Sequence, residues 1–401
     1  MPSSSSAGIF RFLEETTIGT IASGNPQTYR VVSGTLKQST TSIDNNELRS
    51  DRGRGDTVLV SGSVNGDLMI DLSFKTHDTF IEALLASTWS NIGTNSVKTV
   101  SDMVLTTGTN IITSATNLLP LLDKGQWFKI TGSSNTSNNG VYRASTTVAP
   151  TIGSITVDPV VKAIAGTTTS ASTVISAARI KQGNATLRAF TIEREISDIA
   201  RFFTWKSCFV SGLKLSYTVG AAVNGSFSFL GQSQETLGTV SLFPGIATAV
   251  AATTTPIINS VTNAILLIDD VTLGTSCLES FSIDIIPGLR ERRCIGNGIV
   301  ASSIAADQFK VTGQMNVFFG STASATLYGK ELLDGVFNLC IQVQDANGMC
   351  YVICIPRGKI TSADVTGGAI GSDVMMTVAF QGVTDPTMTS MIMIDRLGTT
   401  V

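Results

Sequence analysis

The chain has 401 residues, enough for two or three domains of ordinary size, each able to bury a core. Hydrophobic residues make up 42% of it and charged residues only 14%, with a formal net charge of −3 and a mean hydropathy of +0.27. The acidic balance excludes a protein that grips nucleic acid through many cations, and no apolar run reaches the roughly 18 residues of a membrane helix.

The start of the chain has no secretory signature. Residues 1–7 contain the run Ser3 to Ser6 and lack both a basic region and an apolar core. We expect residues 1–27 to form a flexible N-terminal arm, and the protein to be made and kept in a cytoplasm.

The next segment, residues 28–90, predicts the first part of a β unit with one short helix. A loop at residues 45–56 carries dense mixed charge, and a strand with the sequence Val-Ser-Gly-Ser-Val-Asn follows it. The loop residues are Glu47, Arg49, Asp51, Arg52, Arg54 and Asp56, and the strand includes Val60, Gly62 and Asn65. A helical pattern at residues 77–87 begins at His77, the only histidine of the chain.

Residues 91–182 differ in composition and predict an inserted small β domain. They are rich in Thr, Ser and Gly, with strands expected at residues 124–132 and 138–143. Asn139-Gly140 is the favoured dipeptide for a tight hairpin turn.

The rest of the chain predicts a duplication. Residues 183–233 complete the first unit, with a strand, a turn at Ser197-Asp198 and a second strand, and residues 234–401 form a second unit with a helix at residues 327–337. The core of the first unit's strand motif matches Val311, Gly313 and Asn316, an offset of 251 residues. Gly231 and Gly382 end both units at an offset of only 151, which places the extra residues in the first copy.

The mixed-charge loop is repeated, since the second copy carries charges at the matching place. These are Arg290, Glu291, Arg292 and Arg293. We interpret both loops as inter-subunit or inter-ring contacts, because charge complementarity fixes register and specificity; the alternative is an ordinary solvated loop. Arg54-Gly55-Asp56 also spells a cell-adhesion tripeptide, but three-residue matches arise by chance.

Catalytic and metal-binding interpretations find little support. A triad would depend on His77, and no nucleophile elbow accompanies it. Glu193 and Glu195 share a strand face, but nearby arginines favour an ion-pair cluster. Asp269-Asp270 and Asp284 lack the alternating ligands of a calcium loop. We therefore predict no enzyme, no metal and no cofactor.

The six cysteines have neither zinc-site spacing nor the density of a disulfide scaffold, so buried free thiols are expected. Cys350 and Cys354 share one strand face, which leaves a redox or inter-subunit role as the alternative. The six are Cys208, Cys277, Cys294, Cys340, Cys350 and Cys354.

Several spaced motifs resemble the tail tube proteins of tailed bacteriophages. They are the run Asn46 to Arg52, Val60 to Leu68, Asp78 to Leu85 with Trp89, Phe190 to Arg194, Phe227 to Gly231, and Asp385-Pro386 to Arg396. The resemblance implies an all-β fold with a short helix per repeat, in which tandem tail-tube β-sandwich domains join into a ring-shaped barrel. Closing a sheet across subunits would remove its exposed edges.

The resemblance also implies function and partners. The chain would be the major tail tube subunit of a sheathless tail, and two sandwiches per chain would give a homotrimeric ring with pseudo-sixfold symmetry, stacked head to tail. The insert at residues 91–182 would then lie on the outside of the ring, because inside the ring it would block the lumen. DNA would pass through the lumen without specific binding, and tape-measure, terminator and distal tail proteins would be partners, with no membrane involved. A host-recognition tail fibre or adhesin, or a tail-spike depolymerase, is the alternative. The location would be the virion tail, after assembly in the host bacterial cytoplasm.

Overall fold

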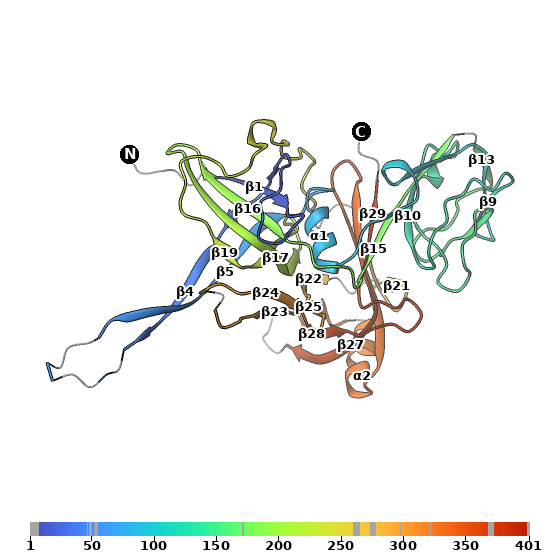
Figure 1. Cartoon of the computed structure of the whole chain (residues 1–401). Coiled ribbons are helices and arrows are strands. Elements are labelled where there is room, and N and C mark those ends of the chain that lie inside the picture. Colours follow the sequence, from blue (N-terminus) through green and yellow to red (C-terminus); the bar gives the residue numbers. More distant parts are fainter. Residues whose placement is uncertain are drawn as a thin grey trace.

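The computed structural model describes residues 8–45, 47, 50–51, 55–170, 172–259, 265–272, 278–296, 298–320, 322–367 and 373–398. This part of the chain is almost entirely antiparallel β-structure with two α-helices (Figure 1), which confirms the all-β fold class. Two sheet units with the same strand order, called copy one and copy two below, carry a smaller β domain, called the insert.

Copy one consists of residues on both sides of the insert. Its elements are β1 (Gly8–Glu14), β2 (Gln27–Tyr29), β3 (Ser33–Gly34), β4 (Lys37–Asp44), β5 (Thr57–Asp71), α1 (Asp78–Leu85), β6 (Ser90–Asn91), β15 (Ala178–Lys181), β16 (Phe190–Ile196), β17 (Arg201–Thr218), β18 (Asn224–Gly231), β19 (Ser233–Gln234) and η4 (Ile246–Thr248).

Copy two follows without interruption by another domain. Its elements are β20 (Ile265–Ile268), β21 (Val271–Thr272), β22 (Leu278–Ile286), β23 (Leu289–Arg292), β24 (Ser303–Ala306), β25 (Lys310–Phe318), α2 (Thr322–Leu332), β26 (Val336–Gln344), β27 (Cys350–Thr366), β28 (Met375–Gly382) and β29 (Met393–Leu397).

The insert has short strands in two four-stranded sheets. Its elements are η2 (Thr94–Ser96), β7 (Val97–Val100), β8 (Met103–Thr106), β9 (Ile111–Ser114), β10 (Trp127–Thr131), η3 (Thr136–Asn138), β11 (Gly140–Arg143), β12 (Ser154–Thr156), β13 (Thr168–Ser170) and β14 (Thr173–Ser176).

The two copies have the same strand order. Copy one runs β4–β5–β18–β17–β16–β1, and copy two runs β22–β25–β28–β27–β26–β20. The long strands β17 and β27 each shift register once where they pair with β18 and β28, between Val210 and Gly212 and between Ile360 and Ser362. A bulge bends and twists a strand, so the first half of each long strand belongs to an outer sheet and the second half to an inner sheet.

The repeat register differs from the sequence alignment by four residues. A Cβ added to Gly231 would meet the Val64 Cβ at 3.1 Å, and one added to Gly382 would meet the Val311 Cβ at 3.1 Å. Val64 is therefore the counterpart of Val311, an offset of 247. Val60 is 41% exposed, whereas Val311 is 1% exposed. The alignment was wrong because an even slip along a strand keeps every side chain on its own face and preserves the pattern.

The same shift reassigns the other motif residues. Gly66, not Gly62, corresponds to Gly313, because Leu68 pairs with Phe227 as Met315 pairs with Val378. Asn65 and Asn316 both lie on the polar face of the inner sheet, but they are not equivalent positions.

One apolar core fills the space between inner and outer sheets, and helix α1 lies in it. Phe80 of α1 packs at 4.5 Å between ring centroids from Phe12 and at 5.1 Å from Phe190. Phe10 and Phe12 of β1 are buried because β1 pairs with β16 along its whole length. The prediction of a flexible arm over residues 1–27 is thus wrong for residues 8–14, while residues 1–7 lie outside the described residues.

The first of the two predicted helices begins where it was expected, and the second does not. His77 directly precedes α1, as expected. The second helix begins at Thr322, five residues before the predicted start at 327, and ends at Leu332. Val336 cannot belong to it because that residue pairs with Lys359 in the β26–β27 ladder.

The insert is shorter than the predicted range of residues 91–182. Strand β15, within the predicted range 91–182, pairs with β29 of copy two and with β6, so it belongs to the outer sheet. Asn139 has a φ of −73° and Gly140 starts β11, so this dipeptide is not the expected type I′ turn, which requires positive φ at both positions. A true turn of this kind lies at Asp269 and Asp270, with φ of 52° and 60°, between β20 and β21.

Candidate functional site

The inner sheets of the two copies are one continuous sheet. Its order is β4–β5–β18–β17–β22–β25–β28–β27, and each neighbouring pair is antiparallel. The link between copies is β17 with β22, where Leu213 lies opposite Ile285 and Thr218 opposite Ser280. A chain that joins its own two copies edge to edge in this way uses β-pairing as its building contact.

One face of this sheet is apolar and the other is polar. Residues such as Leu213, Ile283 and Val378 point into the core, and the alternate positions point away from it. Most of those alternate positions carry short uncharged side chains: Asn65, Ser216, Ser226, Ser228, Ser280, Ser282, Thr312, Gln314, Asn316, Ser362, Thr366, Thr377 and Gln381.

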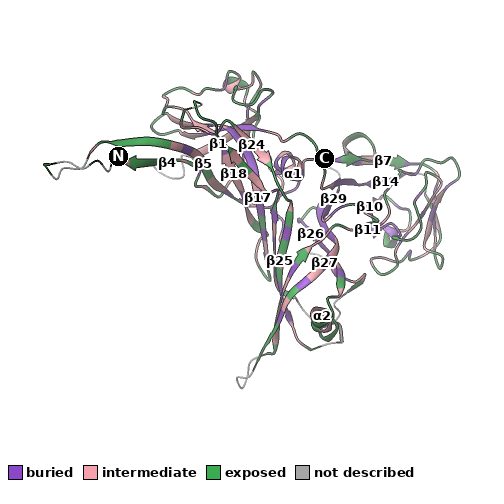
Figure 2. Cartoon of the chain, turned by 60° about the horizontal axis from the view of Figure 1, so that its bottom comes forward, coloured by how far each residue is buried: buried purple, intermediate pink, exposed green. Residues whose placement is uncertain are grey.

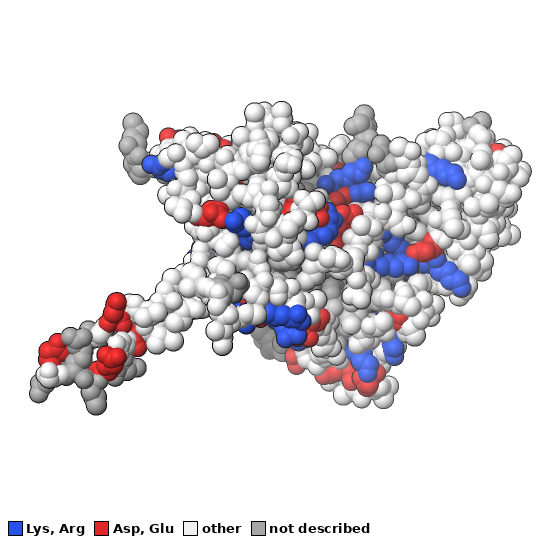
Figure 3. Space-filling view, in the orientation of Figure 1, with Lys and Arg blue, Asp and Glu red and all other residues white. Residues whose placement is uncertain are grey.

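Charges on the polar face are few and near balance. They include Lys37, Lys214, Lys310, Asp67, Asp71, Asp284 and Asp364. The wider surface is also sparsely charged, as the largely white area of Figure 3 shows. A surface of this kind offers phosphates few cationic contacts.

The continuous sheet ends in two edges. Within the described residues, β3 and β4 pair only with β5, and the second half of β27 pairs only with β28. The β4 edge is partly covered at one point, where Gln38 N donates to Gln234 Oε1 at 3.2 Å. Unpaired strand edges are templates for pairing with another chain.

A long hairpin made of β4 and the first half of β5 projects from the body of the molecule (Figures 1 and 2). Its apolar side chains are largely exposed: Ile43 is 58% exposed, Val58 61% and Leu59 45%. Isolated two-stranded ribbons are marginally stable in water, so a contact with another surface would stabilise this hairpin.

The predicted contact loop lies at the tip of this hairpin and is described only in part. Glu47 and Asp51 are exposed there, and the Glu47 N–H donates to Asn45 Oδ1 at 2.9 Å. Arg49, Arg52 and Arg54 lie outside the described residues, so their contact role stays a prediction.

The equivalent loop of copy two folds back onto copy one. Arg290, Glu291 and Arg292 lie on β23, which pairs with β24. Arg293 Nη2 donates to the Gly62 carbonyl at 3.1 Å, and the Gly62 N–H donates to the Ile299 carbonyl at 2.7 Å. Two sequence-predicted residues, Arg293 and Gly62, are thus in direct contact within one chain.

The insert packs on the outer sheet of copy two, which is buried on both faces. Ile353 and Ile355 of β27 point into the core that the two copies share, whereas Val352 and Cys354 point into the core of the insert. This alternation places the insert on the side of the outer sheet that faces away from the inner sheet.

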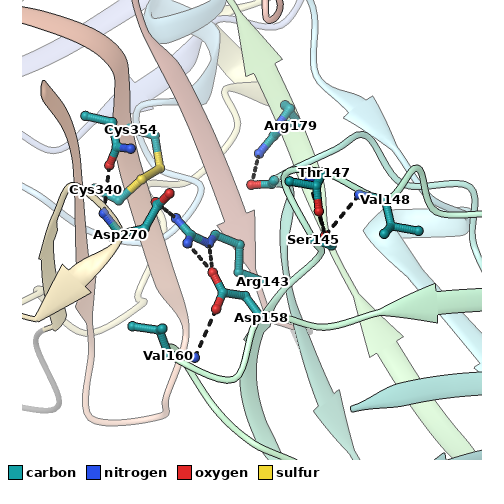
Figure 4. Close-up of polar contacts among 12 residues, drawn as sticks. Arg143, Ser145, Thr147, Val148, Asp158, Val160, Arg179, Asp270, Cys340 and Cys354 are labelled. Atoms are coloured by element: carbon teal, nitrogen blue, oxygen red, sulfur yellow. Dashed lines mark hydrogen bonds and ion pairs between the residues drawn. A yellow bond between two sulfur atoms is a disulfide. The ribbon is translucent and has the colours of Figure 1, made fainter. Parts of the chain in front are cut away.

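Polar contacts of two arginines join the insert to strands of the two copies. Arg179 of β15, 2% exposed, donates from Nε and Nη2 to the two oxygens of Asp395 of β29 at 2.6 Å each, and Nη2 also donates to the Gly125 carbonyl of the insert at 2.9 Å. Arg143 of the insert joins Asp158 of the insert and Asp270 of copy two (Figure 4). Sequence reasoning missed these pairs, because lone charges scattered along apolar strands give no spacing signal.

A second cationic link involves Arg396, which pairs with Asp78 at the start of α1 and lies 4.7 Å from the Trp89 ring centroid. Burial lowers the pKa of Arg396 to about 10. This contact joins copy two to the helix of copy one.

The candidate catalytic residues have structural roles. Glu193 is fully buried and accepts hydrogen bonds from the Ser241 hydroxyl at 2.7 Å and from the Leu242 N–H at 3.1 Å. Glu195 pairs with Arg11 at 2.6 Å. These contacts satisfy the carboxylates.

The aspartates considered for calcium are likewise accounted for. Asp269 pairs with Lys330 and Asp270 with Arg143, while Asp284 lies opposite Lys214 on the neighbouring strand. In the described part of the chain there is no group of three or more His, Cys, Asp or Glu that could hold a metal ion. No helix among the described residues is long and apolar enough to cross a membrane.

The expectation that all cysteines are free thiols is wrong. Cys340 and Cys354 form a disulfide across β26 and β27 (Figure 4). Cys208 and Cys350 are buried and free, and burial raises the pKa of Cys350 to about 12. Cys294 is free and exposed, and Cys277 lies outside the described residues. The bonded pair was missed because it is formed between strands, not along one strand.

These features define a class of all-β protein in which two copies share one strand order and the described residues leave a strand edge unpaired at each end of the inner sheet. The sequence matches the family described as phage tail tube protein over residues 5–382, nearly the whole chain, so the chain belongs to that family of structural virion proteins. A search of curated proteins found no match.

Proposed function

We propose that this chain is the major tail tube subunit, which polymerises into stacked rings around a channel for DNA. The observation that carries the proposal is the continuous inner sheet, with a core-facing apolar face, a polar opposite face and a strand edge at each end. Pairing these edges between chains closes the sheet into a barrel and leaves no edge exposed.

The proposed ring contains three chains. Each chain contributes two copies with the same strand order, so three chains give six sandwiches and pseudo-sixfold symmetry. Rings stacked head to tail form an open filament, and the projecting hairpin of β4 and β5 is suited to a contact with a neighbouring subunit or ring.

The channel wall in this proposal is the polar face of the inner sheet. Side chains such as Ser226, Ser282 and Thr377 give it hydrogen-bonding groups without a high density of positive charge. Binding to DNA strengthens with each phosphate that a cation neutralises. A wall with few cations therefore lets DNA slide during ejection.

The insert decorates the outside of the tube. Support comes from Val352 and Cys354, which point from the outer sheet into the core of the insert, away from the proposed channel. An outer decoration of this size suits a tail without a contractile sheath, as in a siphovirus.

Family membership supports the remaining partners and the location. We place the protein in the virion tail, assembled in the host bacterial cytoplasm, with a tape-measure protein in the lumen before ejection and terminator and distal tail proteins at the ends. DNA passes without specific binding, and no cofactor, catalysis or membrane is involved.

Negative-stain microscopy of the purified chain tests this proposal. Rings or tubes with a central channel and six similar lobes are expected, with outer knobs on alternate lobes. Slender rods would instead favour a tail fibre, and a monomer at high concentration would contradict self-assembly.

A further inference from the structure

The junction between the two copies inside one chain is a template for the junction between two chains. At this junction the last inner strand of copy one, β17, pairs with the first inner strand of copy two, β22. The equivalent strands at the two outer edges are the second half of β27 and the interrupted strand β3–β4. Both present an edge without a strand partner in the described part of the molecule.

The duplication fixes how these edges align. Leu213 pairs with Phe227 as Ala363 pairs with Val378, and Phe227 and Val378 are equivalent positions, so Ala363 is the counterpart of Leu213. The offset of 247 makes Gln38 the counterpart of Ile285, since Gln38 pairs with Val64 as Ile285 pairs with Val311.

When the internal register is transferred to two chains, Ala363 lies opposite Gln38. In the next pair, Asp364 lies opposite Lys37. The internal counterpart of that next pair is Lys214 opposite Asp284. Both junctions therefore bring a lysine opposite an aspartate, with the two charges exchanged between the strands. Lys37 and Asp364 are exposed and make no ion pair within the described residues.

Hydrogen-bond geometry supports a close contact between these side chains. The Val219 N–H donates to the Glu279 carbonyl at 3.2 Å, and in an antiparallel ladder hydrogen-bonded pairs alternate with non-hydrogen-bonded pairs. Lys214 and Asp284 therefore form a non-hydrogen-bonded pair, the type in which side chains lie closer. The Gln38 N–H points outward from β4, as the transferred register requires. In the single chain it donates to Gln234 Oε1, a contact that the incoming strand would replace.

Burial supports the same alignment. Leu215 and Ile283, which lie opposite each other at the internal junction, are 2% and 0% exposed. Their counterparts are Val365 and Leu36, and Val365 is 42% exposed in the single chain. An exposed valine at a position whose internal counterpart is fully buried is expected where a neighbouring strand belongs.

We propose that a second copy of this chain pairs its β3–β4 strand antiparallel to β27, with Lys37 of one copy opposite Asp364 of the other. This inference rests on the proposed tube function and specifies its subunit contact to the residue.

The same offset of 247 residues between the copies also indicates where the projecting hairpin of a neighbouring chain binds. In copy one, Gly62 is covered by the loop of copy two through the Ile299 carbonyl. The counterpart of Gly62 is Phe309, which lines an open groove of about 360 Å³ together with Val311, Gly382 and Met391. The β4–β5 hairpin of the neighbouring copy, with its exposed apolar side chains, is the occupant that the repeat predicts.

Charge exchange tests the pairing. Lys37→Asp and Asp364→Lys each place like charges opposite one another at every junction of the ring. Since an opposite-charge cross-strand pair stabilises and a like-charge pair destabilises by about 0.2–1 kcal/mol, we expect each single variant to raise the concentration for half-assembly about two- to thirtyfold per junction. The double variant Lys37→Asp with Asp364→Lys restores opposite charges and should assemble as the unmodified chain does.

Disulfide cross-linking tests the register in the same samples. Lys37→Cys with Asp364→Cys, in a Cys294→Ser background, should give a covalently closed oligomer on oxidation, because non-hydrogen-bonded pairs have Cα atoms close enough for a disulfide. The control Thr35→Cys with Asp364→Cys is two residues out of register and should cross-link far less.

The outcomes separate two kinds of failure. If the unmodified chain assembles but the charge variants assemble equally well, or the control cross-links as readily as the in-register pair, the proposed junction is wrong and the tube function stands. If the unmodified chain stays monomeric, the tube function itself fails and the junction fails with it.

Discussion

Acidification should destabilise the fold through a single side chain. His77 is the only histidine of the chain, and it is 1% exposed. Its Nδ1 lies 2.7 Å from the Tyr29 hydroxyl and its Nε2 3.2 Å from the Asp71 carbonyl. Burial is the main cause that lowers the pKa of His77 to about 4; the positive charge of Arg30 lowers it further, and the Asp71 carbonyl opposes the shift.

The sign follows from proton binding. The unfolded chain has the ordinary histidine pKa of about 6.5, so between pH 6.5 and 4 it binds a proton that the folded chain excludes. The contribution of neutral His77 to the free energy of unfolding is therefore fully present above about pH 6.5, and it is lost as the pH falls toward 4. Between pH 7 and pH 5 the free energy of unfolding should decrease by about 2 kcal/mol.

Urea unfolding of the dispersed subunit at pH 7, 6 and 5 measures this effect, because carboxylates titrate mostly below that window. His77→Gln is the control and should remove most of the slope between pH 7 and 5. A flat profile for the unmodified chain, or the same slope in His77→Gln, would refute the assignment of His77 as a buried neutral group.

Three further predictions concern the insert and the channel. Arg179→Met leaves the buried Asp395 charge without its partner and should lower the free energy of unfolding by about 3–5 kcal/mol in urea, while adding Asp395→Leu should recover much of the loss; equal losses in both variants would show that the pair is not the cause. Replacing residues 97–177 by a short Gly-Ser linker exposes apolar side chains such as Val352 and Met393, so the free energy of unfolding should fall by several kcal/mol. The variant should still keep the inner sheet and form rings, which circular dichroism and microscopy would show. Complete loss of rings in a folded deletion variant would place the insert in the wall of the tube. Replacing Ser226, Ser282 and Thr377 together with Lys should leave tubes intact and make the rate of DNA ejection fall with decreasing salt; an unchanged rate would contradict the assignment of this face to the channel.

The sequence was sufficient to predict the all-β class, because the alternation of apolar and polar residues along a strand is visible in the order of the residues. It was not sufficient to align the repeat, since Val60 and Val64 are valines of the same strand four residues apart, and an even slip preserves the expected alternation. Only the pairing of Val64 with Gly231 distinguishes them. The register that relates the two copies is a property of neighbouring strands, and it is absent from any one strand.

The contacts that join parts of the molecule were also beyond sequence reasoning. Arg179 and Asp395 are 216 residues apart, and Cys340 and Cys354 bond across two strands. The loop around Arg293 was noticed because its charges are dense and repeated, but the contact that the structure shows for Arg293 is with Gly62 of the same chain. Its role between subunits or rings stays a prediction. Local density is visible in a sequence, whereas a single buried pair is visible only after folding.

The most direct test of the central claim is a cryo-electron microscopy reconstruction of the purified assembly. We predict three chains per ring, an inner sheet that runs without a break from β27 of one chain into β4 of the next, and the insert on the outside. A ring whose inner strands end at each subunit, or an assembly with no central channel, would contradict the account.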